Sequence, residues 1–156
     1  MDIKKFFADE FDEHAEVTAL TRKSCADGFA TLLDRCAESI RHGGKIIFFG
    51  NGGSAADCQH LATELTIRYK TDRAPIAAIA LTTDTSALTA VGNDLGFENI
   101  FARQIEALGK PGDVAIGIST SGNSENVIRA LKAAQALNIV AAALSGKNGG
   151  RLVGLA

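Results

Sequence analysis

The sequence predicts a three-layer α/β/α protein, in which helices cover both faces of a parallel sheet with the strand order 2-1-3-4. Four short apolar segments alternate with helical patterns along most of the chain, and such alternation is typical of parallel sheets. The segments are almost continuously apolar, as strands buried on both faces are. Glycine clusters adjoin the ends of these segments, where α/β proteins carry their ligand loops. A length of 156 residues favours one domain.

Two helices are expected before the first strand. Residues 2–23 carry a broad apolar stripe, which includes three phenylalanines, Phe6, Phe7 and Phe11. Ser24 is expected to cap a second helix, which Gly43-Gly44 ends. This pair of helices, residues 1–43, either covers the sheet or packs against the same pair of another subunit.

The remaining residues, 44–156, are expected to form the α/β core. Strands are predicted at 45–49, 76–81, 113–118 and 139–144. Helices are predicted at 54–69, in a short segment reaching 91, and at 97–108 and 126–137, and 151–156 resembles the opening of one more helix. The last residues are apolar, and a sheet of this type usually continues into a fifth strand and a closing helix. We therefore expect the sequence to be truncated at its C-terminus.

Composition excludes several classes of protein. The net charge is −2 and no cluster of Lys and Arg stands out, so a nucleic-acid partner is not expected. No apolar run approaches the roughly 18 residues of a membrane span. Acidic residues occupy the place of a signal peptide's apolar stretch, and a cytoplasmic location is expected. The three cysteines are expected to be reduced thiols of the core: Cys25, Cys36 and Cys58.

Two loops are the strongest candidates for ligand binding. The first, residues 50–54, follows the first predicted strand, and the second, residues 119–124, follows the third. In the flavodoxin-like order 2-1-3-4 these strands are neighbours, so both loops lie at the switch point where open α/β sheets bind ligands. The second loop combines four hydroxyls with a helix N-terminus, which favours a phosphate monoester. The alternative is an ordinary Ser/Asn-rich turn with a helix cap.

A nucleotide cofactor is not expected. A dinucleotide fingerprint would require a third glycine where Ala55 stands, and no phosphate-binding motif of the G-x-x-x-x-G-K-[ST] type occurs. The ligand is therefore expected to be a small phosphorylated molecule.

The helix after the first loop places Asp57, His60 and Glu64 on one face. The spacing of His60 and Glu64 suits a shared divalent metal, and a carboxylate there suits a general base. The alternative is a solvated polar face. The pair Asn93-Asp94 is either a capping turn or a polar wall of the pocket.

Four motifs together resemble the sugar-isomerase (SIS) domain family: GNGGSAADCQHLATEL, LTTDTSALTAVGNDLGF, GDVAIGISTSGNSENV and LSGKNGG. The resemblance covers essentially the whole chain and implies a single SIS domain, residues 1–156. It also implies an aldose–ketose isomerisation, sedoheptulose 7-phosphate to D-glycero-D-manno-heptose 7-phosphate, which feeds lipopolysaccharide or related glycoconjugates. Homotetramers with sites shared between subunits are implied as well, and the phenylalanines of residues 1–43 favour assembly through these helices.

The resemblance also implies roles for individual residues. Glu64 corresponds to the catalytic base, and His60 and Glu64 to ligands of one Zn²⁺ per subunit. The substrate-binding set is Asn51, Gly52, Gly53, Ser54, Asn93, Asp94, Ser119, Thr120, Ser121 and Ser124. The family's C-terminal helix, whose Gln and His complete the metal shell and the acid–base pair, has no counterpart in these residues. A competing class is the non-catalytic SIS relative that binds a sugar phosphate or associates with a replication initiator; the presence of Glu64 favours the isomerase.

Overall fold

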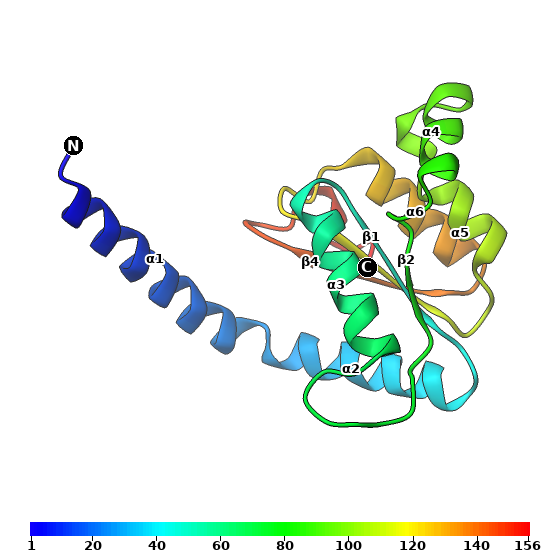
Figure 1. The fold of residues 1–156 in the computed structure, drawn as a ribbon, viewed down its shortest axis with the longest axis horizontal. Coiled ribbons are helices and arrows are strands. Elements are labelled where there is room, and N and C mark those ends of the chain that lie inside the picture. The colour runs from blue at the N-terminus through cyan, green and yellow to red at the C-terminus, as the bar shows by residue number, and fades with distance from the viewer. The chain divides into compact units, whose positions relative to one another are not determined.

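A four-stranded parallel sheet lies at the centre of the α/β part of the protein (Figure 1). The computed structural model describes residues 1–156. Its strands run in the order β2-β1-β3-β4, which confirms the predicted order. Their bounds are β1 Ile46–Gly50, β2 Ala78–Ala80, β3 Val114–Ser119 and β4 Val140–Ser145.

The chain divides into two compact units, Met1–Asp34 and Arg35–Ala156. The boundary falls inside the second helix. The helices are α1 Ile3–Ser24, α2 Ala26–Arg41, α3 Gly53–Thr66, α4 Thr85–Asp94, α5 Ala102–Leu108 and α6 Glu125–Ala136, with short 3₁₀ turns η1 Phe97–Asn99 and η2 Gly150–Leu152.

The first unit holds α1, which has no buried residue. Asp2 caps it by accepting hydrogen bonds from the backbone N–H groups of Lys4 and Lys5. Ser24 was expected to cap the second helix, and this prediction is wrong: Ser24 is the last residue of α1, and its hydroxyl donates to the Leu20 carbonyl one turn earlier. A hydroxyl that bonds backwards into its own helix is not available to start the next one.

The crossover helices sit on the sheet as a doubly wound fold requires. Helix α3 packs on β1 and β2, whereas α6 packs on β3 and β4, and right-handed crossovers place the two on opposite faces. The buried cluster joins the sheet to α5 and α6, and its largest members are Phe49 and Phe101, whose ring centroids lie 5.6 Å apart. Because every residue of β1 is buried, this strand is held on both faces.

The register brings the strands' carboxyl ends to one edge. Gly50 of β1 lies beside Ile118 of β3, and Ser119 lies beside Ser145 of β4. At the opposite edge, the buried Asp113 accepts from the backbone N–H and the ammonium of Lys45, at 3.0 and 2.5 Å. This contact fixes the start of β3 against the start of β1, and so aligns the two loops that follow their ends.

One predicted helix is divided in the structure. The segment expected as a helix over 97–108 forms η1 and then α5. The adjacent residues Ile100 and Phe101 are both buried, although successive residues of one helix lie 100° apart. The break between the two segments lets both side chains enter the core.

The cysteine prediction holds in part. All three thiols are free, and Cys58 is buried, but Cys25 is exposed, so it is not a core thiol. Burial raises the pKa of Cys58 to about 12, which keeps this thiol protonated and inert. None of the helices is both long and apolar enough to cross a membrane.

Candidate active site

The first predicted ligand loop joins the end of β1 to the start of α3. Asn51 and Gly52 form the turn, and Gly53 and Ser54 open the helix. Gly52 caps α3 with a φ of 56° and a ψ of −122°, a conformation essentially restricted to glycine. No side chain caps this helix, so its first N–H groups face the carboxyl edge of the sheet without a side-chain partner.

The second loop runs from the end of β3 to the start of α6. The hydroxyls of Ser119 and Ser124 lie 3.0 Å apart, and Ser121 accepts from the backbone N–H of Asn123 at 3.2 Å. Ser124 occupies the cap position of α6 but makes no capping hydrogen bond. The helix N-terminus and its neighbouring hydroxyls can therefore donate to an anion. We call residues 119–124 the phosphate loop below.

The two loops are joined by a residue that the sequence analysis missed. The side-chain amides of Asn51 and Asn126 exchange two hydrogen bonds, at 2.9 and 2.8 Å. Asn126 is almost fully buried in the first turn of α6. An asparagine inside a predicted helix does not by itself indicate a contact with another loop. Only the fold brings the Asn51 amide opposite Asn126. This pair fixes the start of α6 to the glycine loop.

A cavity of about 180 Å³ opens beside the first loop. Gly50, Asn51 and Gly52 form one wall, and the remaining lining residues come from α3, the loop after β2, α4 and the segment around η1. Most of that lining is apolar, with Leu88, Phe97, Ile100 and Phe101 among its residues, and Thr82 adds a hydroxyl. The cavity confirms that space exists next to the predicted glycine loop, but the hydroxyls of the phosphate loop do not line it.

The predicted pair Asn93-Asp94 forms the last turn of α4, not a turn after it. Both residues are exposed, and the Asn93 amide donates to the Asp94 carboxylate at 2.7 Å. The helix extends beyond its expected end at Val91 because Gly92 does not take the positive φ of a helix-ending glycine and continues the helix. Leu95 closes α4 through a backbone bond to the Val91 carbonyl.

Glu64 lies in the last turn of α3. Its carboxylate is 3.5 Å from Nε2 of His60, and its side chain is 31% exposed, against 72% for His60. Arg73 donates to the backbone carbonyls of Glu64 and Leu65 at 2.6 and 2.8 Å. The guanidinium thereby takes up carbonyls that the end of the helix leaves unpaired, and the backbone that carries Glu64 is held in place.

The loop after β4 packs directly on the phosphate loop. Ser145 donates to the Ser119 carbonyl at 2.9 Å, and the backbone N–H of Arg151 donates to the Asn123 side chain at 3.2 Å. Gly122 has a φ of 67°, and a Cβ there would stand 1.9 Å from the Gly149 carbonyl oxygen. Only glycine allows this close approach.

Comparison with known proteins decides the family. The model of the SIS domain matches residues 11–146. The chain belongs to the SIS domain family. It is 56% identical to the phosphoheptose isomerase of Paramagnetospirillum magneticum over 156 residues, which are 100% of this chain and 81% of that protein. It is 55% identical to the phosphoheptose isomerase of Aquifex aeolicus over 146 residues, 94% of this chain and 76% of the relative.

Solved structures of SIS proteins share the fold. The phosphoheptose isomerase of Neisseria gonorrhoeae superimposes with a TM-score of 0.91 at 43% identity, over 97% of this chain and 79% of that one. A phosphoheptose isomerase from Francisella tularensis gives a TM-score of 0.95 at 34% identity, over 99% of this chain and 81% of the other. The predicted resemblance and fold are thus both confirmed.

The residues of this SIS chain do not by themselves complete a zinc site. His60 and Glu64 are close enough to share a metal, but no group of three or more His, Cys, Asp or Glu side chains is arranged to hold one. Zinc takes at least three protein ligands in catalytic sites. The zinc prediction therefore stays a prediction, and no step of the reaction below depends on it.

Proposed function

We propose that this SIS protein interconverts sedoheptulose 7-phosphate and D-glycero-D-manno-heptose 7-phosphate, the first step of heptose synthesis for lipopolysaccharide or other glycoconjugates. The observation that carries the proposal is the phosphate loop, four hydroxyls at an uncapped helix N-terminus, in a chain of this family. The relatives that match along nearly its whole length are named phosphoheptose isomerases.

The phosphate loop anchors the far end of the substrate. Ser119, Thr120, Ser121 and Ser124 supply the hydroxyls, and the first turn of α6 supplies backbone N–H groups. The opposite loop approaches the sugar with Asn51, Gly52, Gly53 and Ser54. The hydroxyls of the sugar contact Asn93 and Asp94. Remote binding at the phosphate holds the reacting carbons in place, which lowers the entropic part of the barrier.

Glu64 is the proposed base. In the ketose the carbonyl is at C2, and C1 carries the proton that must leave. Glu64 takes that proton, an enediol forms, and the carboxylic acid returns a proton to C2. One proton also passes from the oxygen on C1 to the oxygen on C2, so the carbonyl moves to C1 and no electrons leave the substrate. The reaction therefore needs no redox cofactor.

The length of α3 supports an active site shared between subunits. Glu64 follows Gly53 by almost the whole helix, which at 1.5 Å per residue is about 16 Å. Six C–C bonds of about 1.5 Å span at most about 9 Å. The carbon chain of a heptose is thus shorter than the rise from Gly53 to Glu64, so a sugar phosphate held at the start of α3 is more easily reached by the Glu64 of a second chain than by that of its own.

Assembly through α1 supplies such a neighbour. Its large apolar residues are more than half exposed within their unit, among them Phe6, Phe7, Phe11, Val17 and Leu20. Apolar surface of this extent is typical of an interface. We propose a homotetramer built through these helices, and light scattering at micromolar concentration is the test. A monomer would contradict it.

The kinetic test replaces Glu64 by glutamine, which keeps the shape and removes the base. We expect turnover of sedoheptulose 7-phosphate to fall by about 10²–10⁴-fold, with binding of the sugar phosphate largely kept. The matched control is Glu106→Gln on α5, whose carboxylate pairs only with Arg103 and should leave turnover unchanged. Near-normal turnover in Glu64→Gln would show that another group is the base, and would favour a binding protein.

A further inference from the structure

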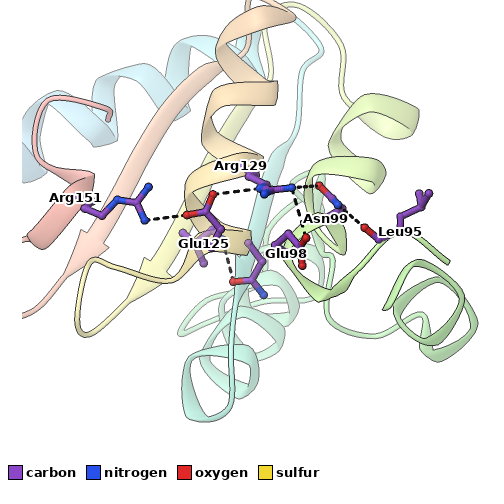
Figure 2. Close-up of polar contacts among 8 residues, drawn as sticks. Leu95, Glu98, Asn99, Glu125, Arg129 and Arg151 are labelled. Carbon is purple, nitrogen blue, oxygen red and sulfur yellow. Dashed lines mark hydrogen bonds and ion pairs between the residues drawn. The ribbon is translucent and has the colours of Figure 1, made fainter. Parts of the chain in front are cut away.

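A continuous line of polar contacts connects three segments around the proposed site (Figure 2). It runs from the Leu95 carbonyl through Asn99, Arg129 and Glu125 to Arg151. The segments that it joins are η1, the first turns of α6, and the loop after β4. The line is not part of the substrate-binding set, so its role requires a separate explanation.

Arg129 stands at the middle of this line. Its Nε donates to Oε1 of Glu125 at 3.1 Å, and its Nη1 donates to Oδ1 of Asn99 at 2.9 Å. Glu98 lies 3.8 Å from the same Nη1. A guanidinium can serve partners in different directions because its donors form a rigid planar fork, which an ammonium lacks.

Two members of the line directly follow residues of the proposed substrate-binding set. On one side, Asn99 donates to the Leu95 carbonyl at 2.6 Å, and Leu95 directly follows Asn93-Asp94. On the other side, Glu125 directly follows Ser124 of the phosphate loop. The contacts of Arg129 therefore couple the two places that must hold opposite parts of one sugar phosphate.

The charges indicate that the arginines position the loops without binding phosphate themselves. Two carboxylates, Glu98 and Glu125, face Arg129, and Glu125 also accepts from Arg151 at 2.8 Å. Hydrogen bonds from Arg151 and then Arg129 hold the pKa of Glu125 below its usual range. Glu125 thus stays ionised at neutral pH, and it already pairs with both guanidinium groups.

We propose that Arg129 is a positioning residue that sets the separation between the phosphate loop and the Asn93-Asp94 turn, so that one sugar phosphate is held at both ends. This inference rests on the proposed function for the identity of the ligand. It predicts that Arg129 affects a ligand spanning both places and has little effect on one that fills only the phosphate loop.

The test compares two ligands on the full chain: sedoheptulose 7-phosphate, which spans both places, and inorganic phosphate, which needs only the loop. We expect Arg129→Ala to raise the KM for the sugar phosphate about tenfold or more, since small misplacements are costly. The inhibition constant of phosphate should change less than about threefold. Arg129→Lys, which reaches one partner at a time, should recover part of the loss.

Two further variants test which contacts of the line matter. Asn99→Ala breaks the connection to Leu95 and leaves the Arg129–Glu125 contact, so it should reproduce the selective loss for the sugar phosphate. Arg103→Ala is the control, because this exposed arginine on α5 pairs only with Glu106. It should change neither ligand's affinity. Thermal unfolding of every variant shows which of them are folded.

The outcomes distinguish this inference from the proposed function. Equal weakening of both ligands in Arg129→Ala would overturn the inference, because Arg129 would then act on the phosphate loop alone. Unchanged KM in Arg129→Ala and Asn99→Ala would overturn it as well. If the wild-type protein forms no aldose, the proposed function fails, and calorimetric binding of the same two ligands then decides the inference. If Arg129→Ala does not fold, the same comparison in Asn99→Ala and Arg129→Lys decides it.

Discussion

Replacing Gly122 by alanine tests whether the loop after β4 must lie against the phosphate loop. Alanine at a φ of 67° costs about 1–2 kcal/mol in the left-handed region. The added Cβ would also stand 1.9 Å from the Gly149 carbonyl oxygen. Backbone on both sides has to move, and forced overpacking of this kind adds about 1–3 kcal/mol. The substitution should therefore destabilise the protein by about 2–5 kcal/mol.

The matched control for this variant is Gly43→Ala. Gly43 also has a positive φ, 80°, but a Cβ there meets nothing within 4 Å, so only the conformational cost of about 1–2 kcal/mol applies. The difference between the two variants isolates the close approach of the loops. Because about 1 kcal/mol shifts the melting temperature of a domain this size by roughly 2–4 °C, Gly122→Ala should melt several degrees below Gly43→Ala in calorimetry.

The affinity for phosphate provides the second measurement on these variants. Gly122→Ala pushes the loop after β4 away from the phosphate loop and should weaken binding of inorganic phosphate. Gly43→Ala, which lies after the end of α2, should leave phosphate binding unchanged. Equal melting temperatures for the two variants would refute the packing argument. Normal phosphate binding in a clearly destabilised Gly122→Ala would show that the loop after β4 supports the fold but not the anion site.

Three further predictions concern stability. Asp113→Ala leaves the Lys45 ammonium and the backbone N–H groups of Lys45 and Lys110 without their acceptor and should cost about 3–5 kcal/mol in denaturant unfolding; Lys45→Met leaves the buried Asp113 carboxylate without its cation and should destabilise the protein as well, and an unchanged unfolding midpoint in both variants would contradict the pair. Ser39→Ala removes a buried hydroxyl that has no hydrogen-bond partner and should stabilise the protein by up to about 1 kcal/mol; a loss of stability would show that the hydroxyl is satisfied. The pKa of Glu125 lies below its usual 4.5 because Arg151 donates to it, so its stabilising contribution is complete above that pH and is lost as the pH falls through the lowered pKa. The melting temperatures of wild type and Glu125→Gln should therefore differ at pH 7 and converge in acid; a constant difference would contradict the ion pair.

The sheet and its two loops could be predicted because local patterns determine them. Buried parallel strands are continuous apolar runs, and glycine and hydroxyl clusters mark the loops at their ends. The order 2-1-3-4 was predicted as the common flavodoxin-like one, and it brings the two loops together. The family resemblance added the residue roles. Element ends were less exact, and the strand expected at 76–81 is reduced to Ala78–Ala80.

The contacts that organise the site could not be predicted. The Asn51–Asn126 amide pair joins residues 75 positions apart, and the contacts of Arg129 with Asn99 and of Arg151 with Glu125 span 30 and 26 positions, so no local spacing indicates them. The division of the 97–108 segment likewise arises from the core, which takes up both Ile100 and Phe101. Tertiary packing decided these features, and the sequence pattern carried only the propensity for a helix.

The most direct test of the central claim is the reaction itself, run in deuterium oxide and followed by NMR. The protein is incubated with sedoheptulose 7-phosphate, and the aldose and its isotope content are measured. Proton transfer through Glu64 by way of an enediol predicts a heptose 7-phosphate aldose that carries solvent deuterium at C2, and Glu64→Gln should slow its appearance. Ketose recovered unchanged and free of deuterium, even with stoichiometric protein, would contradict the account.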